Sequence, residues 1–370
     1  MPLNSTATTS APKRWQHRLT GGFPRRHHHR KKSISTALKR YCGWLVRKRR
    51  RRSRISTFVR KRKHDAIYIV VRMLVAFAGR MPRAAGLALF GRLGQIVALL
   101  SPGDRKVAGE NLRRVFGGAW SEKQIRRFIM RVYRELGKNV FDTLYLARCP
   151  REELLGIVKD TGFDRFEAAF REGKGAIALT AHLGCFESLL HLFPRRGFAS
   201  FAVGRRLFDR RIDRIVTGLR SGEDIDYVYR NESPRKILGL LKEGRTMGVL
   251  IDQDTNVEGV FARFLGAVAH TPSGPMRMAM RYGIPAFVVT IARQPDNTHL
   301  ASITGPLELD DTGEPERDLV TNVEKANARI SEAILKNPDQ WVWMHRRWRK
   351  RPSDPGCRHV PNIEAYETVA

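Results

Sequence analysis

Beginning near residue 174, short apolar runs alternate with segments of helical period, and few folds accommodate such a pattern. Apolar runs bounded by glycine, proline or polar residues predict strands. These runs cover residues 176–181, 198–203, 246–251, 286–291 and 301–303. A helix is expected at 234–242, with Ser233 as its cap and Gly244 beyond its end. Apolar residues from Leu319 to Ile334 mark a late helix. The sequence therefore predicts an α/β sheet domain.

Upstream of this domain, residues 66–100 are the most apolar part of the chain. No part of them reaches the roughly 18 uncharged residues that a membrane-spanning helix needs. We expect two helices lying in one leaflet of a membrane, with arginines reaching the headgroups. These are Arg72, Arg80, Arg83 and Arg92. A buried helical hairpin is the alternative, but the basic segment upstream favours the membrane.

A second helical pattern follows at about 122–140. Ser121 and Gln124 form a capping box, and apolar residues from Ile125 to Leu136 keep helical spacing. We therefore expect a helix over these residues.

The charge of the chain is very uneven. The formal net charge is +32, and residues 1–63 hold 21 Lys and Arg with no acid before Asp65. Such a segment cannot bury enough apolar surface to offset its chain entropy, so we expect it to be disordered. The remainder has 47 basic and 36 acidic residues. A basic surface of this kind suits nucleic acid, anionic lipid or an acidic protein.

His182 and Glu187 follow the strand expected at 176–181, with Gly184 between them. Gly184 permits a sharp turn, and Glu187 falls in the first turn of the next helix. Both side chains are expected at the carboxyl edge of the sheet, where α/β active sites gather. A carboxylate beside an imidazole fixes its tautomer, and the free ring nitrogen can take a proton from a hydroxyl. The alternative is a histidine that is merely hydrogen-bonded at a strand end.

Cys185 lies inside this motif but is expected to pack rather than react, because its neighbours Leu183 and Phe186 are packing residues. The cysteines are scattered and form no Cys-x-x-Cys pair. They are Cys42, Cys149, Cys185 and Cys357. This spacing predicts neither a zinc site nor a disulfide framework, and it fits a reducing compartment. The N-terminus shows no pattern of a cleavable signal peptide.

Two further clusters follow. Asp252, Gln253 and Asp254 come directly after the strand at 246–251. Such carboxylates bind a metal, orient a substrate or cap a loop, and a metal is the least favoured interpretation because no third ligand is evident. Residues 337–349 interleave three tryptophans with His345 and arginines. This segment suits nucleic-acid stacking, a bilayer interface or a core with a basic edge. We expect at least one of the tryptophans to pack in the core.

Together these motifs resemble the late acyltransferases of lipid A biosynthesis. The resemblance covers about 66–350 and rests on His-x-x-x-x-Glu after a strand, Asp-Gln after a later strand, and Trp-Val-Trp-Met-His-Arg-Arg-Trp at 341–348. Asn-Leu-Arg-Arg-Val-Phe at 111–116 and Phe-Leu-Gly at 264–266, followed by Thr-Pro, also match. Family members usually carry Asn-Trp where this chain has Cys185-Phe186.

The resemblance implies an α/β fold with a mixed sheet flanked by helices, related to the glycerol-3-phosphate acyltransferases, and a membrane-associated helical segment before it. It implies His182 as general base and Glu187 as its partner. Arg205, after the second strand, is expected to meet phosphate or developing negative charge. Asp252 and Gln253 are expected to bind the substrate. No metal and no cofactor are expected.

The resemblance also implies the partners and the location. The acyl donor is expected to be an acyl carrier protein, and the acceptor a phosphorylated glycolipid, at the cytoplasmic face of the bacterial inner membrane. We expect a basic disordered tail at 1–63, a helical membrane-associated segment at 64–150, the catalytic region at 151–352 and a C-terminal tail at 353–370.

A thioester is already electrophilic, so direct transfer to a lipid hydroxyl is expected, with no covalent enzyme intermediate. Backbone N–H groups after Gly184, together with Arg205, are candidates for stabilising the oxyanion. The basic body suits an acidic carrier protein and a phosphorylated lipid, so no nucleic acid is expected. One alternative is an acyltransferase for another glycolipid or a lysophospholipid. Another is an inactive basic relative that binds membrane or RNA, which the intact His182 and Glu187 argue against.

Overall fold

The computed structural model describes residues 62, 64–222, 224–230, 232–352 and 354. Contacts divide the chain between residues 63 and 64, and the sheet and its helices belong to the second unit. Apart from Arg62 and Asp354, the tails predicted at 1–63 and 353–370 lie outside the described residues.

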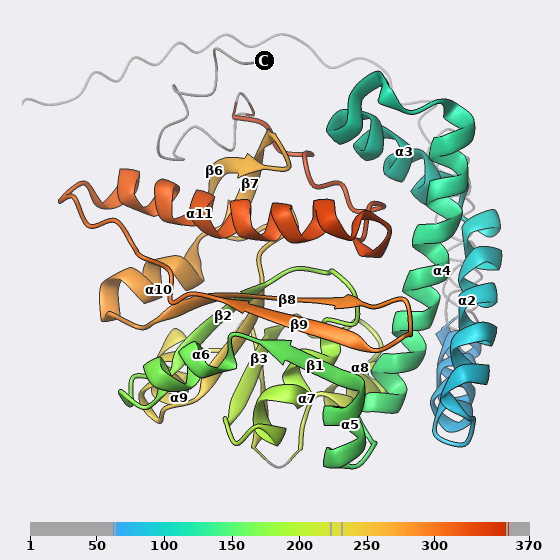
Figure 1. Ribbon diagram of the computed structural model, residues 1–370, viewed down its shortest axis with the longest axis horizontal. Coiled ribbons are helices and arrows are strands. Elements are labelled where there is room, and N and C mark those ends of the chain that lie inside the picture. The colour runs from blue at the N-terminus through green and yellow to red at the C-terminus, as the bar shows by residue number, and fades with distance from the viewer. Residues whose placement is uncertain (1–61, 63, 223, 231, 353, 355–370) are drawn as a thin grey trace, which may run out of the picture. The chain divides into compact units, whose positions relative to one another are not determined.

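Seven strands form one sheet in the order β1-β9-β8-β2-β5-β3-β4 (Figure 1). Their bounds are β1 Val158–Thr161, β2 Ala176–Thr180, β3 Ser200–Gly204, β4 Ile225–Tyr229, β5 Thr246–Leu250, β8 Ala286–Arg293 and β9 His299–Thr304. The strands β2, β3, β4, β5 and β8 are parallel, whereas β9 is antiparallel to β8 and carries β1 alongside it in parallel. The mixed sheet expected from the sequence is thus confirmed. A separate hairpin joins β6 Gly259–Phe264 to β7 Ala267–Pro272.

Helices cover both faces of this sheet (Figure 1). The α-helices are α2 Arg83–Leu100, α3 Pro102–Phe116, α4 Glu122–Leu146, α5 Arg151–Ile157, α6 Phe163–Phe170, α7 Glu187–Arg195, α8 Arg210–Leu219, α9 Pro234–Lys242, α10 Gly274–Tyr282 and α11 Pro315–Lys336. Short 3-10 turns lie at Gly117–Ala119 and Pro338–Gln340. Because side chains alternate along a strand, Ile177 of β2 shares a core with Val323 of α11, and Ala178 shares another with Phe166 of α6 and Leu189 of α7.

The helices predicted from capping signals are present. The Ser121–Gln124 capping box begins α4, which runs further than expected, to Leu146. The α9 helix occupies the predicted 234–242, and the hydroxyl of Ser233 accepts a hydrogen bond from the Arg235 N–H at 3.2 Å. These local signals are informative because the first N–H groups of a helix have no partner within the helix, and a nearby side chain can satisfy them.

The apolar segment 66–100 also forms two helices, residues 64–78 and α2. Among the described residues, α2 is the one helix whose length and composition would let it cross a membrane, and 33% of it is buried. The helix pair leaves large apolar side chains exposed. They include Ile69, Met73, Phe77, Ile96, Val97, Leu99 and Leu100.

Glycines bring α2 and α4 into backbone contact. A Cβ atom on Gly94 would lie 2.1 Å from the carbonyl oxygen of Tyr133, and one on Gly137 would lie 2.1 Å from that of Phe90. Small residues of this kind let helices pack closely by van der Waals contact, which does not depend on surrounding water. The interface therefore suits an apolar as well as an aqueous environment.

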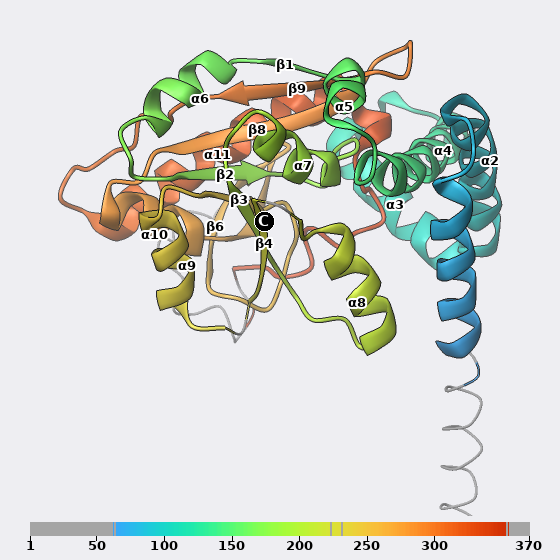
Figure 2. The same cartoon turned by 90° about the horizontal axis from the view of Figure 1, so that it is seen from below.

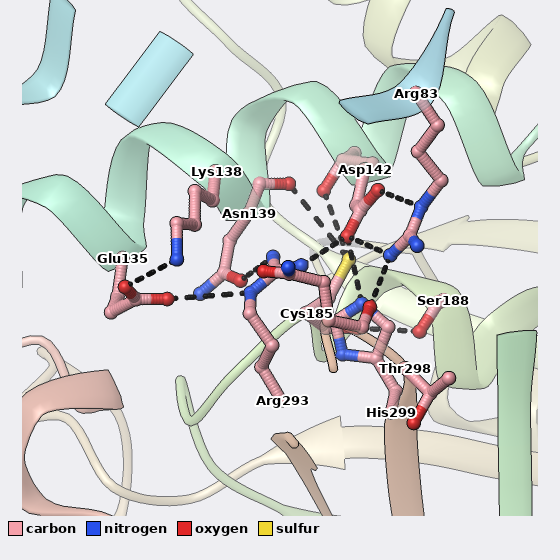
Figure 3. A network of polar contacts seen from close by, with 12 residues as sticks. Arg83, Glu135, Lys138, Asn139, Asp142, Cys185, Ser188, Arg293, Thr298 and His299 are labelled. Carbon is pink, nitrogen blue, oxygen red and sulfur yellow. Dashed lines mark hydrogen bonds and ion pairs between the residues drawn. The ribbon is translucent and has the colours of Figure 1, made fainter. Parts of the chain in front are cut away.

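A buried polar network fixes the other end of this helix pair (Figure 3). The carboxylate of Asp142, on α4, accepts two hydrogen bonds of 2.9 Å from Arg83 at the start of α2. It also lies 2.6 Å from Nη1 of Arg293 and 2.8 Å from Nε2 of His299, at the facing ends of β8 and β9. Asp142 thus ties α2 and α4 to the sheet.

Candidate active site

The turn between β2 and α7 carries His182 at the carboxyl edge of the sheet, as the sequence predicts. Gly184 in this turn has φ +58°, and a Cβ atom there would lie 2.3 Å from the carbonyl oxygen of Ile291. Only glycine fits this position. The N–H of Gly184 donates to the carbonyl of Gln340 at 3.1 Å, so β8 and the C-terminal segment both fix the turn.

Asp252 is the carboxylate that contacts His182. Nδ1 of His182 lies 2.8 Å from Oδ1 of Asp252, and the His182 backbone N–H donates to Oδ2 at 2.9 Å. The indole N–H of Trp341 donates to the same Oδ2 at 2.8 Å. Burial would raise the pKa of Asp252, but the interaction with His182 and these hydrogen bonds outweigh it and lower the pKa to about 2. A buried, ionised carboxylate therefore holds the imidazole.

Asp252 identifies the free nitrogen of this imidazole. An ionised carboxylate only accepts hydrogen bonds, so Nδ1 of His182, 2.8 Å from Asp252, carries the ring proton. The free nitrogen is then Nε2, which lies 3.2 Å from the side-chain amide of Gln253. The ring is thus held in the tautomer that leaves Nε2 basic.

Glu187 does not pair with His182, contrary to the sequence analysis. Its carboxylate makes a two-pronged ion pair with Arg220, in which Nε of Arg220 donates to Oε2 at 2.8 Å and Nη2 donates to Oε1. The strand order gives the reason. Thr180 of β2 is in register with Leu250 of β5, so the residues two positions further, His182 and Asp252, lie side by side. Glu187 begins α7 and meets the end of α8 instead.

An apolar pocket of about 220 Å³ opens beside His182. Its floor is one face of β2, β3 and β5, formed largely by small residues such as Ala178, Ala202 and Gly248. Residues of α7, among them Leu189 and Phe193, form the opposite wall. Phe186, Glu187, Arg220 and Tyr227 also line it. The small side chains on the strands leave room for a narrow apolar ligand that runs along the sheet.

The other predicted site residues lie around this pocket. Arg205 follows Gly204, which lines the pocket, but its own side chain is exposed and makes no hydrogen bond or ion pair with another described residue. Asp254 is buried and binds the C-terminal segment: its N–H donates to Nε2 of His345 at 3.0 Å, and its carboxylate accepts from Arg349 and from the Lys350 N–H. No group of three His, Cys, Asp or Glu within the described ranges is arranged to hold a metal ion.

A family model for bacterial lipid A biosynthesis acyltransferases matches residues 55–350, most of the chain. The chain belongs to this family. It is 23% identical over 265 residues to a lipid A biosynthesis palmitoleoyltransferase of Escherichia coli (strain K12), an alignment that covers 70% of this chain and 84% of the relative. A lipid A biosynthesis acyltransferase of Shigella flexneri gives the same identity and coverage.

In this lipid A acyltransferase the tryptophan-rich segment is part of the core. Trp341, Trp343 and Trp348 are 1%, 0% and 8% exposed, which confirms that at least one packs inside. Trp341 also contacts Asp252 directly. The guanidinium of Arg347 is buried against the ring of Phe264, 4.5 Å from its centroid. The segment therefore packs against the edge of the sheet that carries His182 and Asp252, and its buried tryptophan rings are not exposed for stacking on nucleic acid.

Cys185 is buried beside α4, with its sulfur 3.7 Å from the hydroxyl of Thr143. Burial raises the pKa of its thiol to about 12, so the thiolate is scarce at neutral pH. The side chain packs, as the sequence analysis expects. Whether it stays unreactive during turnover is a prediction.

Two residues of the candidate site are not apparent from the sequence. Arg220 stands at the end of α8, and nothing in the local sequence distinguishes it from the other arginines of that region. The contact of Trp341 with Asp252 spans 89 positions of sequence. The family motifs include the segments that carry Asp252 and Trp341, but they do not predict that these two side chains are in contact.

Proposed function

We propose that this acyltransferase moves a fatty acyl group from an acyl carrier protein thioester to a hydroxyl of a lipid A precursor. The observation that carries the proposal is the pairing of His182 with buried Asp252 at the rim of an apolar pocket. The ring nitrogen that faces away from Asp252 is the basic one, and a base at the mouth of an apolar pocket suits transfer of an apolar group to a hydroxyl.

In the proposed reaction, the acceptor hydroxyl takes the place of the Gln253 amide on Nε2 of His182. His182 then accepts the hydroxyl proton as the oxygen attacks the thioester carbonyl, a contribution of roughly 10²–10⁴-fold. Asp252 stabilises the imidazolium that forms. When the tetrahedral intermediate collapses, the proton passes to the departing thiolate, so that one ester forms and one thioester breaks.

The oxyanion needs donors near the same turn. The N–H of Gly184 is engaged by Gln340, so the N–H groups that follow it, at the start of α7, support the proposal best. Glu187 and Arg220 contribute by closing one wall of the pocket beside the base. Arg205, exposed at the end of β3, is proposed to meet a phosphate of the acceptor or donor.

The apolar pocket is proposed to hold the acyl chain. Five-residue strands form its floor, so it extends over about 13 Å at roughly 3.3 Å per residue. Moving an acyl chain through water costs about 0.8 kcal/mol for each exposed CH₂. We therefore propose that the enzyme works at a membrane surface, with the helices of 64–100 in contact with lipid. The family resemblance implies that this surface is the cytoplasmic face of the inner membrane.

The test is mass spectrometry of lipid A from cells with and without this protein, followed by a reaction of the purified enzyme. Acyl carrier protein loaded with a fatty acid and a lipid A precursor should give one added acyl group and free carrier thiol. Transfer to a lysophospholipid, with none to the lipid A precursor, would contradict the proposal.

A further inference from the structure

We propose that Leu207 and Phe208, in the loop between β3 and α8, insert into an anionic bilayer surface and form a second membrane contact beside the acyl pocket. The proposal rests on the proposed function in so far as the substrates are lipids. Phe208 is 82% exposed, more than any other large apolar residue in the described part of the chain, and Leu207 is 39% exposed. Two adjacent apolar side chains are thus presented to the surroundings.

Hydrogen bonds to buried and helix-capping side chains hold the loop in this conformation. The backbone N–H of Leu207 donates to the buried carboxylate of Asp213 at 2.7 Å, and the hydroxyl of Tyr229 donates to the other oxygen at 2.6 Å. Asp209 caps α8 by accepting from the Arg211 N–H at 2.9 Å. With its backbone anchored on both sides of Phe208, the loop directs that ring outward as a fixed feature.

The loop lies against the N-terminal helix at residues 64–78. The Phe208 and His64 rings lie 5.3 Å apart, and Arg211 pairs with Asp65 at 2.8 Å and covers the Tyr68 ring. Figure 2 shows α8 beside this helix. The helix exposes further apolar side chains: Ile67, Ile69, Val70, Met73 and Phe77. One helix and one distant loop, which touch through His64, Asp65 and Tyr68, therefore both expose large apolar side chains.

The positive charges around the loop favour an anionic membrane surface as its binding partner. Arg205, Arg206, Arg210 and Arg214 are exposed on the loop and on α8. The guanidinium of Arg206 lies over the Tyr229 ring at 4.3 Å, and Asp209 is already paired with Arg211. Apolar side chains ringed by arginines fit a bilayer, in which the rings enter the acyl region and the guanidinium groups meet anionic headgroups.

The loop lies next to the mouth of the proposed acyl pocket. The loop begins directly after Gly204, which lines the acyl pocket together with Val203. If Phe208 enters the bilayer, the mouth of the pocket lies at the lipid boundary, and an acyl chain or acceptor reaches it without crossing water.

The experiment measures co-sedimentation of the full-length protein with phosphatidylcholine vesicles that contain or lack phosphatidylglycerol. The variants are Phe208→Ser, Arg210→Gln with Arg214→Gln, and Leu335→Ser as a matched control, since Leu335 is 50% exposed on α11. Phe208→Ser should weaken binding to both vesicles about tenfold, the effect of losing most of one aromatic insertion. The double arginine variant should weaken binding only when phosphatidylglycerol is present, and Leu335→Ser should change neither.

Equal binding of Phe208→Ser and the unaltered protein would overturn the inference, as would an equal loss in Leu335→Ser. An unchanged vesicle affinity with a raised KM for the loaded carrier protein would assign the surface to the carrier instead. Acyl transfer in detergent separates the two proposals. If the unaltered protein transfers no acyl group there, the proposed function fails, whereas the vesicle result stands by itself. Thermal unfolding checks that each variant is folded.

Discussion

At the scale of single residues, the pair formed by His182 and Asp252 carries the proposed chemistry. His182→Ala should lower kcat by about 10²–10⁴, because it removes the base. Asp252→Asn should have an effect of the same order, because an amide does not stabilise the imidazolium and allows the wrong tautomer. Steady-state transfer from the loaded carrier protein measures both. Near-normal turnover in either variant would contradict the assignment.

Gly248 tests the proposed acyl pocket. A Cβ atom there meets only the carbonyl oxygen of Phe201, at 3.8 Å, so a larger side chain would extend into the pocket. Gly248→Leu should lower kcat/KM for long acyl chains about tenfold or more relative to short ones, because a few methylene groups lose their space. Gly239→Leu on α9, which meets nothing within 4 Å, is the control. An unchanged preference for chain length would place the acyl chain elsewhere.

The residue scale also shows where prediction from the sequence succeeds and fails. His182 can be placed because a polar residue directly after a buried strand is a local signal. Its pairing with Asp252 cannot, because the two are 70 positions apart and meet only through the adjacency of β2 and β5. Glu187 is only five positions from His182 in the sequence, and for that reason the sequence favours it as the partner of His182. In the structure, the direction of the first turn of α7 brings the Glu187 carboxylate to Arg220 instead.

At the scale of secondary-structure elements, the contact between α2 and α4 depends on glycine. Gly94→Ala should destabilise the protein by about 1–3 kcal/mol or release α2, because its Cβ would overlap the backbone of α4. Gly103→Ala on α3 has open space, and should raise helix stability by about 0.5–1 kcal/mol. Denaturant unfolding in detergent distinguishes them. Equal effects would show that the helices are not in close contact.

The network around Asp142 predicts a pH dependence. Burial would raise the pKa of Asp142, but His299 and the two arginines lower it well below its usual range. Its stabilisation is therefore complete above the unfolded pKa of about 3.9 and is lost as the pH falls below that value. Asp142→Asn should cost about 3–5 kcal/mol at pH 7, because the buried Arg293 and the half-buried Arg83 lose their charged partner.

The difference between Asp142→Asn and the unaltered protein should shrink as the pH falls from 4 toward 2, which urea unfolding at several pH values measures. The exposed pair of Glu122 with Arg113 provides the control, and Glu122→Gln should cost at most about 1 kcal/mol. A difference that stays constant with pH would show that the Asp142 carboxylate is not held in its ionised form by this network.

The elements themselves are predictable to different degrees. β2, β5 and β8 are apolar runs with clear boundaries, and α4 and α9 have capping residues. The edge strands β1 and β4 are not predicted. Their sequences, Val-Lys-Asp-Thr and Ile-Asp-Tyr-Val-Tyr, mix polar and apolar residues, because an edge strand is less deeply buried. The order of the strands determines which side chain contacts His182, and no short stretch of sequence predicts that order.

At the scale of the whole molecule, the basic segment at 1–63 should be dispensable for chemistry. All residues of the proposed site, the floor of the acyl pocket included, lie between Ala178 and Trp341. A shortened protein that begins at Lys63 should keep its turnover in detergent and at most bind anionic vesicles more weakly, since clustered lysine and arginine favour anionic lipid. Turnover of the two forms, measured side by side, checks this. Loss of folding on removal would show that the segment belongs to the folded part.

The hydrogen bond from Trp341 to Asp252 also sets an order of events during synthesis. The indole follows the carboxylate by 89 positions, so a nascent chain carries His182 and Asp252 well before it carries the group that completes their environment. The Gly184 turn likewise waits for Gln340. His182 therefore leaves the ribosome before Gln340 and Trp341 have been synthesised, and the proposed site can be completed only late in translation. Premature stops shortly before Trp341 would yield proteins with every motif residue of the β2 and β5 turns but an unfinished active site.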